Sequence, residues 1–143
     1  MARNKYLIPL ILLVGDLLAL VLFVYVGQRD HDLVNEAYPM LGVLITSIMF
    51  AGPWVLTGWL LGAFPSRETL SARSLLARTL NAWLVTALSG LLIRSYALGR
   101  AVVPTVFITA TLVFGGLFLF GWRILFLLLW KLSARRINSS APR

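Results

Sequence analysis

The chain has 143 residues, of which 59% are hydrophobic and only 13% are charged, and its mean hydropathy is +0.88. Soluble domains carry about a quarter charged residues, so this composition excludes a soluble globular domain. The net charge of +8 does not indicate nucleic-acid binding, because the basic residues lie at the ends of apolar stretches rather than in one tract. Without cysteine, the chain cannot form disulfides or cysteine-ligated metal sites.

Four apolar stretches are long enough to cross a membrane as helices, which takes about 20 residues. They lie at residues 6–26, 39–64, 80–96 and 103–130. We therefore expect an all-α fold, a bundle of four transmembrane helices that forms a single domain over residues 1–143. A basic tail follows at residues 131–143. The segment 66–78 before the third span is either a short interfacial helix that continues into that span or a plain basic loop.

Lysine and arginine counts near the span ends predict the orientation in the membrane. Nine of these residues lie in the N-terminal segment, the loop between spans two and three, and the tail, against three in the other two loops. Because cytoplasmic segments are enriched in Lys and Arg, we expect both termini in the cytoplasm. The expected location is the plasma membrane, with membrane lipids as partners.

The first span contains a carboxylate, Asp16, at membrane depth. Such a group costs roughly 2.5–3.5 kcal/mol at the centre of a membrane helix. Arg123 in the antiparallel fourth span lies at a similar distance from the cytoplasmic end, so we predict an ion pair between these two residues. The alternatives are that Arg123 extends to the headgroups or that Asp16 is protonated. A structural role is favoured over a proton or ion path, which normally needs a relay of ionisable groups.

Small residues and a proline predict how the helices pack. Small residues that let membrane helices approach closely are Gly15 and Ala19 in the first span, Gly58 and Gly62 in the second, and Gly116 in the fourth. Pro53 should bend the second span, either to shape its packing or to open a binding site.

The tryptophans and the fourth span add expectations about burial. Trp83 and Trp130 are expected in an aromatic belt at the cytoplasmic interface, and the other three tryptophans are expected to pack deeper. One face of the fourth span is expected to combine residues at spacings of three and four: Thr105, Thr109, Leu112, Gly116, Phe120 and Arg123.

The polar residues form no catalytic or metal-binding motif. The only histidine, His31, stands between Asp30 and Asp32 in the first outer loop, and adjacent positions do not easily converge on one ion. No GxSxG, HExxH or glycine-rich phosphate loop is present. We expect no metal, no cofactor and no enzymatic activity.

Several short motifs occur in a particular order along the chain. They are Gly15-Asp16-Leu17-Leu18-Ala19-Leu20, Gly27-Gln28-Arg29-Asp30-His31, Trp54, Gly58-Trp59, Pro65, Arg94, Leu98-Gly99-Arg100, Pro104 and Gly121-Trp122-Arg123. In this order and spacing, over roughly residues 10–129, the chain resembles the bacterial four-helix membrane family known as domain of unknown function 3054. The resemblance implies a small protein of the bacterial plasma membrane and brings no activity with it.

The resemblance also ranks site residues. It implies that the following are signature positions: Asp16, Arg29, His31, Arg94, Arg100 and Arg123. The predicted topology places four of them together on the outer side: Arg29, His31, Arg94 and Arg100. Such a basic cluster would suit an anionic headgroup, a carboxylate or an acidic partner surface.

Three functions remain open at this point. The first is an accessory or scaffold subunit, or a membrane interaction protein, that binds other membrane subunits or itself. The second is a small oligomeric transporter or channel that uses Asp16 and Arg123. The third is a lipid- or quinone-binding protein with a groove near Pro53.

Overall fold

The computed structural model describes residues 6–30, 38–99 and 102–139, and these residues form helices joined by short connections. The helices are α1 (Leu7–Asp30), α2 (Pro39–Leu60), α3 (Ala72–Ala97), and a fourth long helix made of α4 (Thr105–Ala110), the π-helical segment η1 (Thr111–Gly115) and α5 (Gly116–Ser139). All four long helices are apolar and long enough to cross a membrane. The expected four-helix membrane fold is therefore confirmed.

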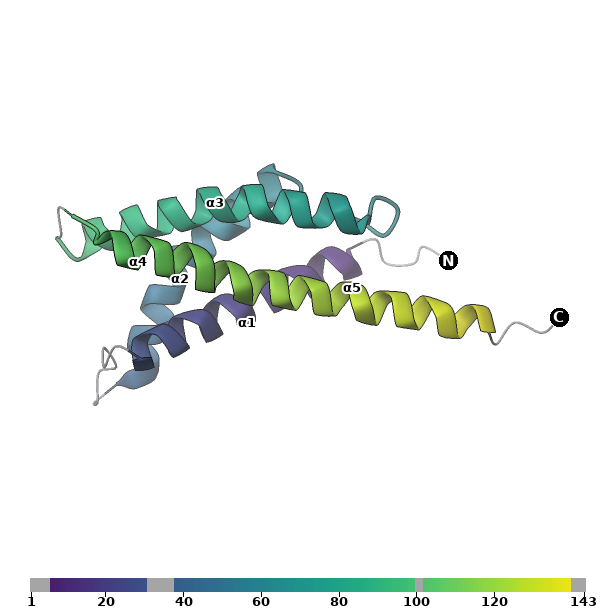
Figure 1. Cartoon of the computed structure of the whole chain (residues 1–143), viewed down its shortest axis with the longest axis horizontal. Coiled ribbons are helices and arrows are strands. Elements are labelled where there is room, and N and C mark those ends of the chain that lie inside the picture. Colours follow the sequence, from purple (N-terminus) through teal and green to yellow (C-terminus); the bar gives the residue numbers. More distant parts are fainter. Residues whose placement is uncertain (1–5, 31–37, 100–101, 140–143) are drawn as a thin grey trace.

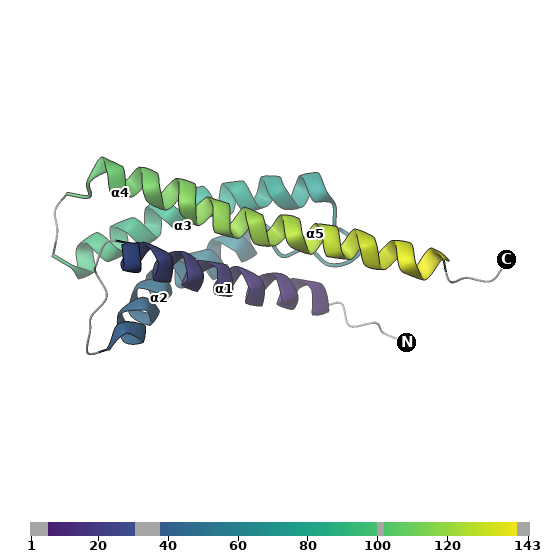
Figure 2. The same ribbon diagram turned by 60° about the horizontal axis from the view of Figure 1, so that its bottom comes forward.

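The helices form an elongated bundle rather than four parallel rods. α1 and α3 run alongside the α4–α5 helix, and α2 crosses them at an angle (Figures 1 and 2). α2 packs mainly against α3 and α1. The start of α1 and the end of α5 lie at the same end of the bundle (Figure 1). This arrangement is consistent with the predicted placement of both termini on one side of the membrane.

α2 ends earlier than the sequence predicts. It stops at Leu60, and Gly62 adopts a positive φ of 66°, a conformation that favours glycine. Gly62 therefore lies outside the helix, and its expected role in a helix-packing pair with Gly58 is wrong. Gly58 instead leaves room for the returning chain, because a Cβ there would clash with the ring of Phe64.

α3 begins well before the expected start of the third span. Ser71 is its N-cap, and the Ser71 hydroxyl accepts a hydrogen bond of 3.2 Å from the backbone N–H of Ser74. The second half of the basic segment 66–78 is therefore the first part of α3, and the first half forms turns. The expected helix that continues into the third span is therefore present from Ala72 on, and the expectation of a plain loop is wrong for that half.

The fourth helix changes register at η1, and the predicted face is wrong for its first part: Gly116 and Arg123 are buried and Leu112 and Phe120 half-buried, as one inward face requires, but the two threonines before η1 are not. Thr105 and Thr109 are exposed, because the wider π turn rotates the residues before it relative to those after it. The buried positions at a spacing of four are Thr111, Gly115, Leu119 and Arg123.

The tryptophans divide differently from the prediction. Trp83 is buried, and its indole N–H donates to the carbonyl of Leu112 in η1 over 3.0 Å, so it is not a belt residue. Trp59 is 73% exposed, so it does not pack inside this chain as expected. Trp54 is fully buried, which confirms its expected packing role.

Candidate functional site

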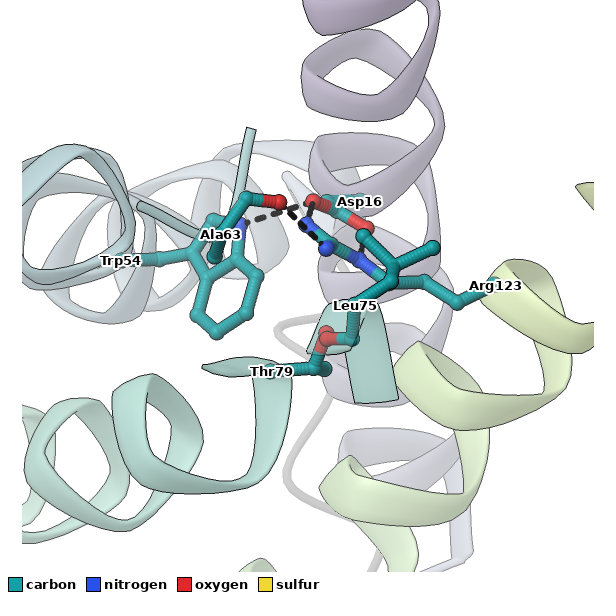
Figure 3. Close-up of polar contacts among 6 residues, drawn as sticks. All are labelled: Asp16, Trp54, Ala63, Leu75, Thr79 and Arg123. Atoms are coloured by element: carbon teal, nitrogen blue, oxygen red, sulfur yellow. Dashed lines mark hydrogen bonds and ion pairs between the residues drawn. The ribbon is translucent and has the colours of Figure 1, made fainter. Parts of the chain in front are cut away.

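The structure brings Asp16 of α1 and Arg123 of α5 into direct contact (Figure 3). Arg123 donates from Nε to Oδ1 of Asp16 over 3.0 Å and from Nη2 to Oδ2 over 2.5 Å. Neither side chain has any exposed area. This two-bond geometry is the strong form of an arginine–carboxylate pair, and it is the contact that the matching depths predicted.

Two further groups complete this site. The indole N–H of Trp54 in α2 donates to Oδ2 of Asp16 over 3.2 Å, and Arg123 Nη1 donates to the carbonyl of Ala63 over 2.6 Å. The Arg123 guanidinium carbon also lies 5.4 Å from the centre of the Trp54 ring and 5.5 Å from that of Phe64. We call Asp16, Trp54, Arg123 and the Ala63 carbonyl the charged network. It joins α1, α2, the α2–α3 connection and α5.

The Ala63 carbonyl belongs to the connection because α2 ends at Leu60. Inside a helix this carbonyl would accept a backbone hydrogen bond, whereas beyond the helix end it can accept one from a side chain. The sequence contains no signal for this acceptor. Trp54 was identifiable in principle, because a buried indole N–H needs an acceptor and Asp16 is the one carboxylate within the first two spans.

A smaller polar contact joins α2 and α3 nearby. The hydroxyls of Thr57 and Thr86 are 2.7 Å apart, and the Thr57 hydroxyl also donates to the carbonyl of Pro53 over 2.8 Å. Pro53 thus lies inside α2 beside an interhelical contact. Thr79, close to the charged network in Figure 3, donates to the carbonyl of Leu75 within α3 over 2.7 Å.

Besides Gly58, two of the predicted small residues lie at close contacts between helices. A Cβ at Gly15 would overlap the indole of Trp122, and a Cβ at Gly116 would lie close to the indole of Trp83. Ala19 is buried in the core beside these contacts. These positions let α1 and α3 approach the fourth helix closely.

The structure describes two of the four residues of the predicted basic cluster. Arg29 is exposed in the last turn of α1, and Arg94 is half-buried near the end of α3. His31 and Arg100 lie outside the described residues. Arg94, in the last turn of α3, lines a cavity of about 300 Å³, and Arg29 does not. We call it the Arg94 cavity; its walls are Phe23, Val24, Val26, Gly27, Gln28, Thr46, Phe50, Arg94, Phe107, Ala110, Thr111, Phe114 and Phe118.

Comparison with known proteins gives a family and no activity. Within the described ranges, no three His, Cys, Asp or Glu side chains gather where they could hold a metal ion. Neither the curated proteins nor the solved structures contain a match to this chain. A family model described as "Protein of unknown function (DUF3054)" matches residues 13–126, a range that contains Asp16, Trp54, Ala63, Arg94 and Arg123. The chain belongs to this family.

Proposed function

We propose that this protein is a non-catalytic accessory or scaffold subunit of the bacterial plasma membrane. The observation that carries the proposal is the charged network, which joins three helices and one connection through four hydrogen bonds. A buried ion pair with satisfied hydrogen bonds adds little net stability but strongly penalises arrangements that separate its partners. The network therefore favours one fixed helix arrangement, as a scaffold requires.

A transport role for the same pair has less support. A transported ion or proton must reach Asp16 or Arg123, and both side chains have no exposed area. A guanidinium can only donate hydrogen bonds, and here each of the three nitrogens of Arg123 already donates to an acceptor. This closed geometry supports a structural role. Liposome flux that disappears in an Asp16→Asn variant would contradict the proposal.

The outward face of α2 supports an interaction with another membrane segment. Most of α2 lies outside the core, and Gly52 on this helix is exposed, with no atom within 4 Å of a Cβ placed there. Large apolar side chains share its face at spacings of three and four: Ile48, Val55, Leu56 and Trp59. Glycine beside large residues lets a second helix approach closely in a membrane.

The proposal is tested by purification of the full chain in a mild detergent, followed by native mass spectrometry. We expect a complex with another membrane protein or with a second copy of the chain. A Gly52→Leu substitution should reduce this association, because it fills the space beside Ile48 and Leu56. The matched control is Gly121→Leu, which changes an exposed glycine of α5 that also has open space around it.

Two results would overturn the proposal. One is a lone chain in every mild detergent tested, with no associated protein and no self-association. The other is an equal loss of association in Gly52→Leu and Gly121→Leu, which would show that the α2 face has no special part in it.

A further inference from the structure

We propose that a groove on the outside of the bundle, between α1 and α5, binds one acyl chain of a membrane phospholipid more tightly than the surrounding lipids are held. We call it the α1–α5 groove. It has a volume of about 700 Å³, within the range of small-molecule sites, and its lining residues lie between Leu10 and Leu22 of α1 and between Leu117 and Leu125 of α5. This lipid site goes beyond the scaffold role and does not depend on it.

The lining of the α1–α5 groove is apolar throughout. None of its side chains carries a hydroxyl, amide or charged group, and its one polar side-chain atom, Nε1 of Trp122, is buried beside Gly15. A polar group placed against such walls would lose its hydrogen bonds, which costs free energy. The groove therefore suits a hydrocarbon chain.

The walls of the groove are exposed and its floor is buried. Leu18 of α1 is 65% exposed and Leu117 of α5 is 61% exposed, whereas Gly15 and Ala19 are buried. Gly121 is exposed as well, with no atom within 4 Å of a Cβ placed there. The groove thus opens along the outside of the bundle, where lipid chains reach it.

The groove lies at the depth of the hydrocarbon core. The apolar spans of these helices run over Leu7–Arg29 and Thr105–Ser133, and the groove residues include or flank the middle of each range. The middle of a span lies in the hydrocarbon core, of which one leaflet contributes about half of about 30 Å. From Leu10 to Leu22 the groove runs about 18 Å at 1.5 Å per residue. Its length therefore matches one acyl chain from one leaflet.

A second transmembrane helix is the alternative occupant, and the polar contacts inside this protein argue against it. Where its own helices pack, polar side chains meet: Thr57 with Thr86 between α2 and α3, Gln28 with Thr46 between α1 and α2, and Asp16 with Arg123 between α1 and α5. Contacts of this kind help to hold membrane helices together. The lining residues of the groove offer a neighbouring helix no such group, so we assign the groove to a lipid chain.

The charged network fixes the shape of the groove from behind. Asp16 follows Gly15 in α1, and Arg123 follows Trp122 in α5. The ion pair and the close contact between the Trp122 indole and Gly15 hold the two walls together. A site with a fixed shape loses less conformational freedom on binding than one that must first be ordered, which favours tight binding of a chain in the groove.

The lipid site is tested by native mass spectrometry of the purified, delipidated full chain. The protein is titrated in detergent with dioleoylphosphatidylcholine, whose headgroup carries no net charge. We expect the first lipid to bind about tenfold or more tightly than later ones. Gly121→Leu fills the groove and should remove this tight first step. The matched control is Gly52→Leu, which changes an exposed glycine of α2 outside the groove and should keep it.

A second measurement locates the lipid without filling the groove. Bromine atoms on an acyl chain quench the fluorescence of an indole that they contact. One equivalent of phosphatidylcholine with dibrominated chains should therefore quench the unmodified protein and also Trp59→Phe, which lacks an exposed indole of α2. Trp122→Phe should lose most of this quenching, because Trp122 lines the groove.

Any of three results contradicts the lipid site. One is an equally tight first lipid in Gly121→Leu with an unchanged melting temperature. Another is undiminished quenching in Trp122→Phe. The third is a dimer of the unmodified protein that Gly121→Leu separates, which would assign the groove to a second copy instead of a lipid. If Gly121→Leu lowers the melting temperature, the quenching experiment alone decides.

Discussion

Arg123 bonds to several groups at once, and these contacts determine how much stability its substitution should cost. It neutralises Asp16 through two hydrogen bonds and supplies the donor for the Ala63 carbonyl, all without exposure to solvent. Removing one member of such a pair leaves a buried charge without compensation. We therefore expect the loss of Arg123 to destabilise the folded chain more than the small net contribution of the intact ion pair would indicate.

We predict that Arg123→Met lowers the stability of the folded chain by about 3–5 kcal/mol, the usual cost of breaking a buried ion pair. Arg73→Met is the control, because Arg73 is exposed at the start of α3 and should change stability little. Thermal unfolding in detergent measures both variants. Equal melting temperatures for the two variants would show that burying Asp16 without Arg123 costs no stability.

The full network also predicts the outcome of a charge reversal. In Asp16→Arg/Arg123→Asp, the short aspartate at 123 cannot replace the arginine as donor to Ala63, and the Trp54 N–H would face a cation. We therefore expect the double variant to recover only part of the stability lost in the single variants, as measured by thermal unfolding. Complete recovery would mean that the pair alone, without Trp54 and Ala63, accounts for the energetics.

Close packing at Gly15 gives a second prediction for single residues. A Cβ there would overlap the Trp122 indole, so Gly15→Ala should destabilise the protein by about 1–3 kcal/mol through overpacking. Gly121→Ala, one residue from Trp122 but with open space around it, should be neutral or slightly stabilising. The difference between their melting temperatures is the measurement, and no difference would refute the close contact.

Among the elements, η1 accepts a side-chain hydrogen bond from another helix. The Trp83 indole of α3 donates to the Leu112 carbonyl inside the π-helical segment. The apolar length of the fourth span predicted a helix there, and periodicity predicted a face of six residues. The helix is present, but the π turn changes its register, because the periodicity of 3.6 residues holds only for an uninterrupted α-helix.

We predict that Trp83→Phe makes the amides of residues 112–116 exchange faster with deuterium, because it removes this hydrogen bond and keeps an aromatic ring. The associated loss of stability should be about 0.5–1.5 kcal/mol. Trp59→Phe changes an exposed indole and should leave exchange in this segment unchanged. Unchanged exchange in both variants would show that the segment holds its form without Trp83.

For the whole molecule, the absence of cysteine offers a direct test of the predicted orientation. Single cysteines at Ser66, in the α2–α3 connection, and at Leu98, just after α3, would lie at opposite ends of α3. With both termini in the cytoplasm, a membrane-impermeant maleimide added to intact cells should label Leu98→Cys and not Ser66→Cys. The reverse pattern would invert the topology and place the Arg94 cavity at the cytoplasmic side.

The sequence alone determined the number of helices, their apolar character and the shared depth of Asp16 and Arg123. These follow from the length of apolar stretches and from residue spacing, which are local properties of a chain that must satisfy its backbone inside a bilayer. Only the tertiary structure decided the other partners of the pair, the π turn and the Arg94 cavity. Each of these depends on contacts between segments far apart in the chain, such as Trp54 with Asp16 and Trp83 with Leu112. Local periodicity does not contain that information.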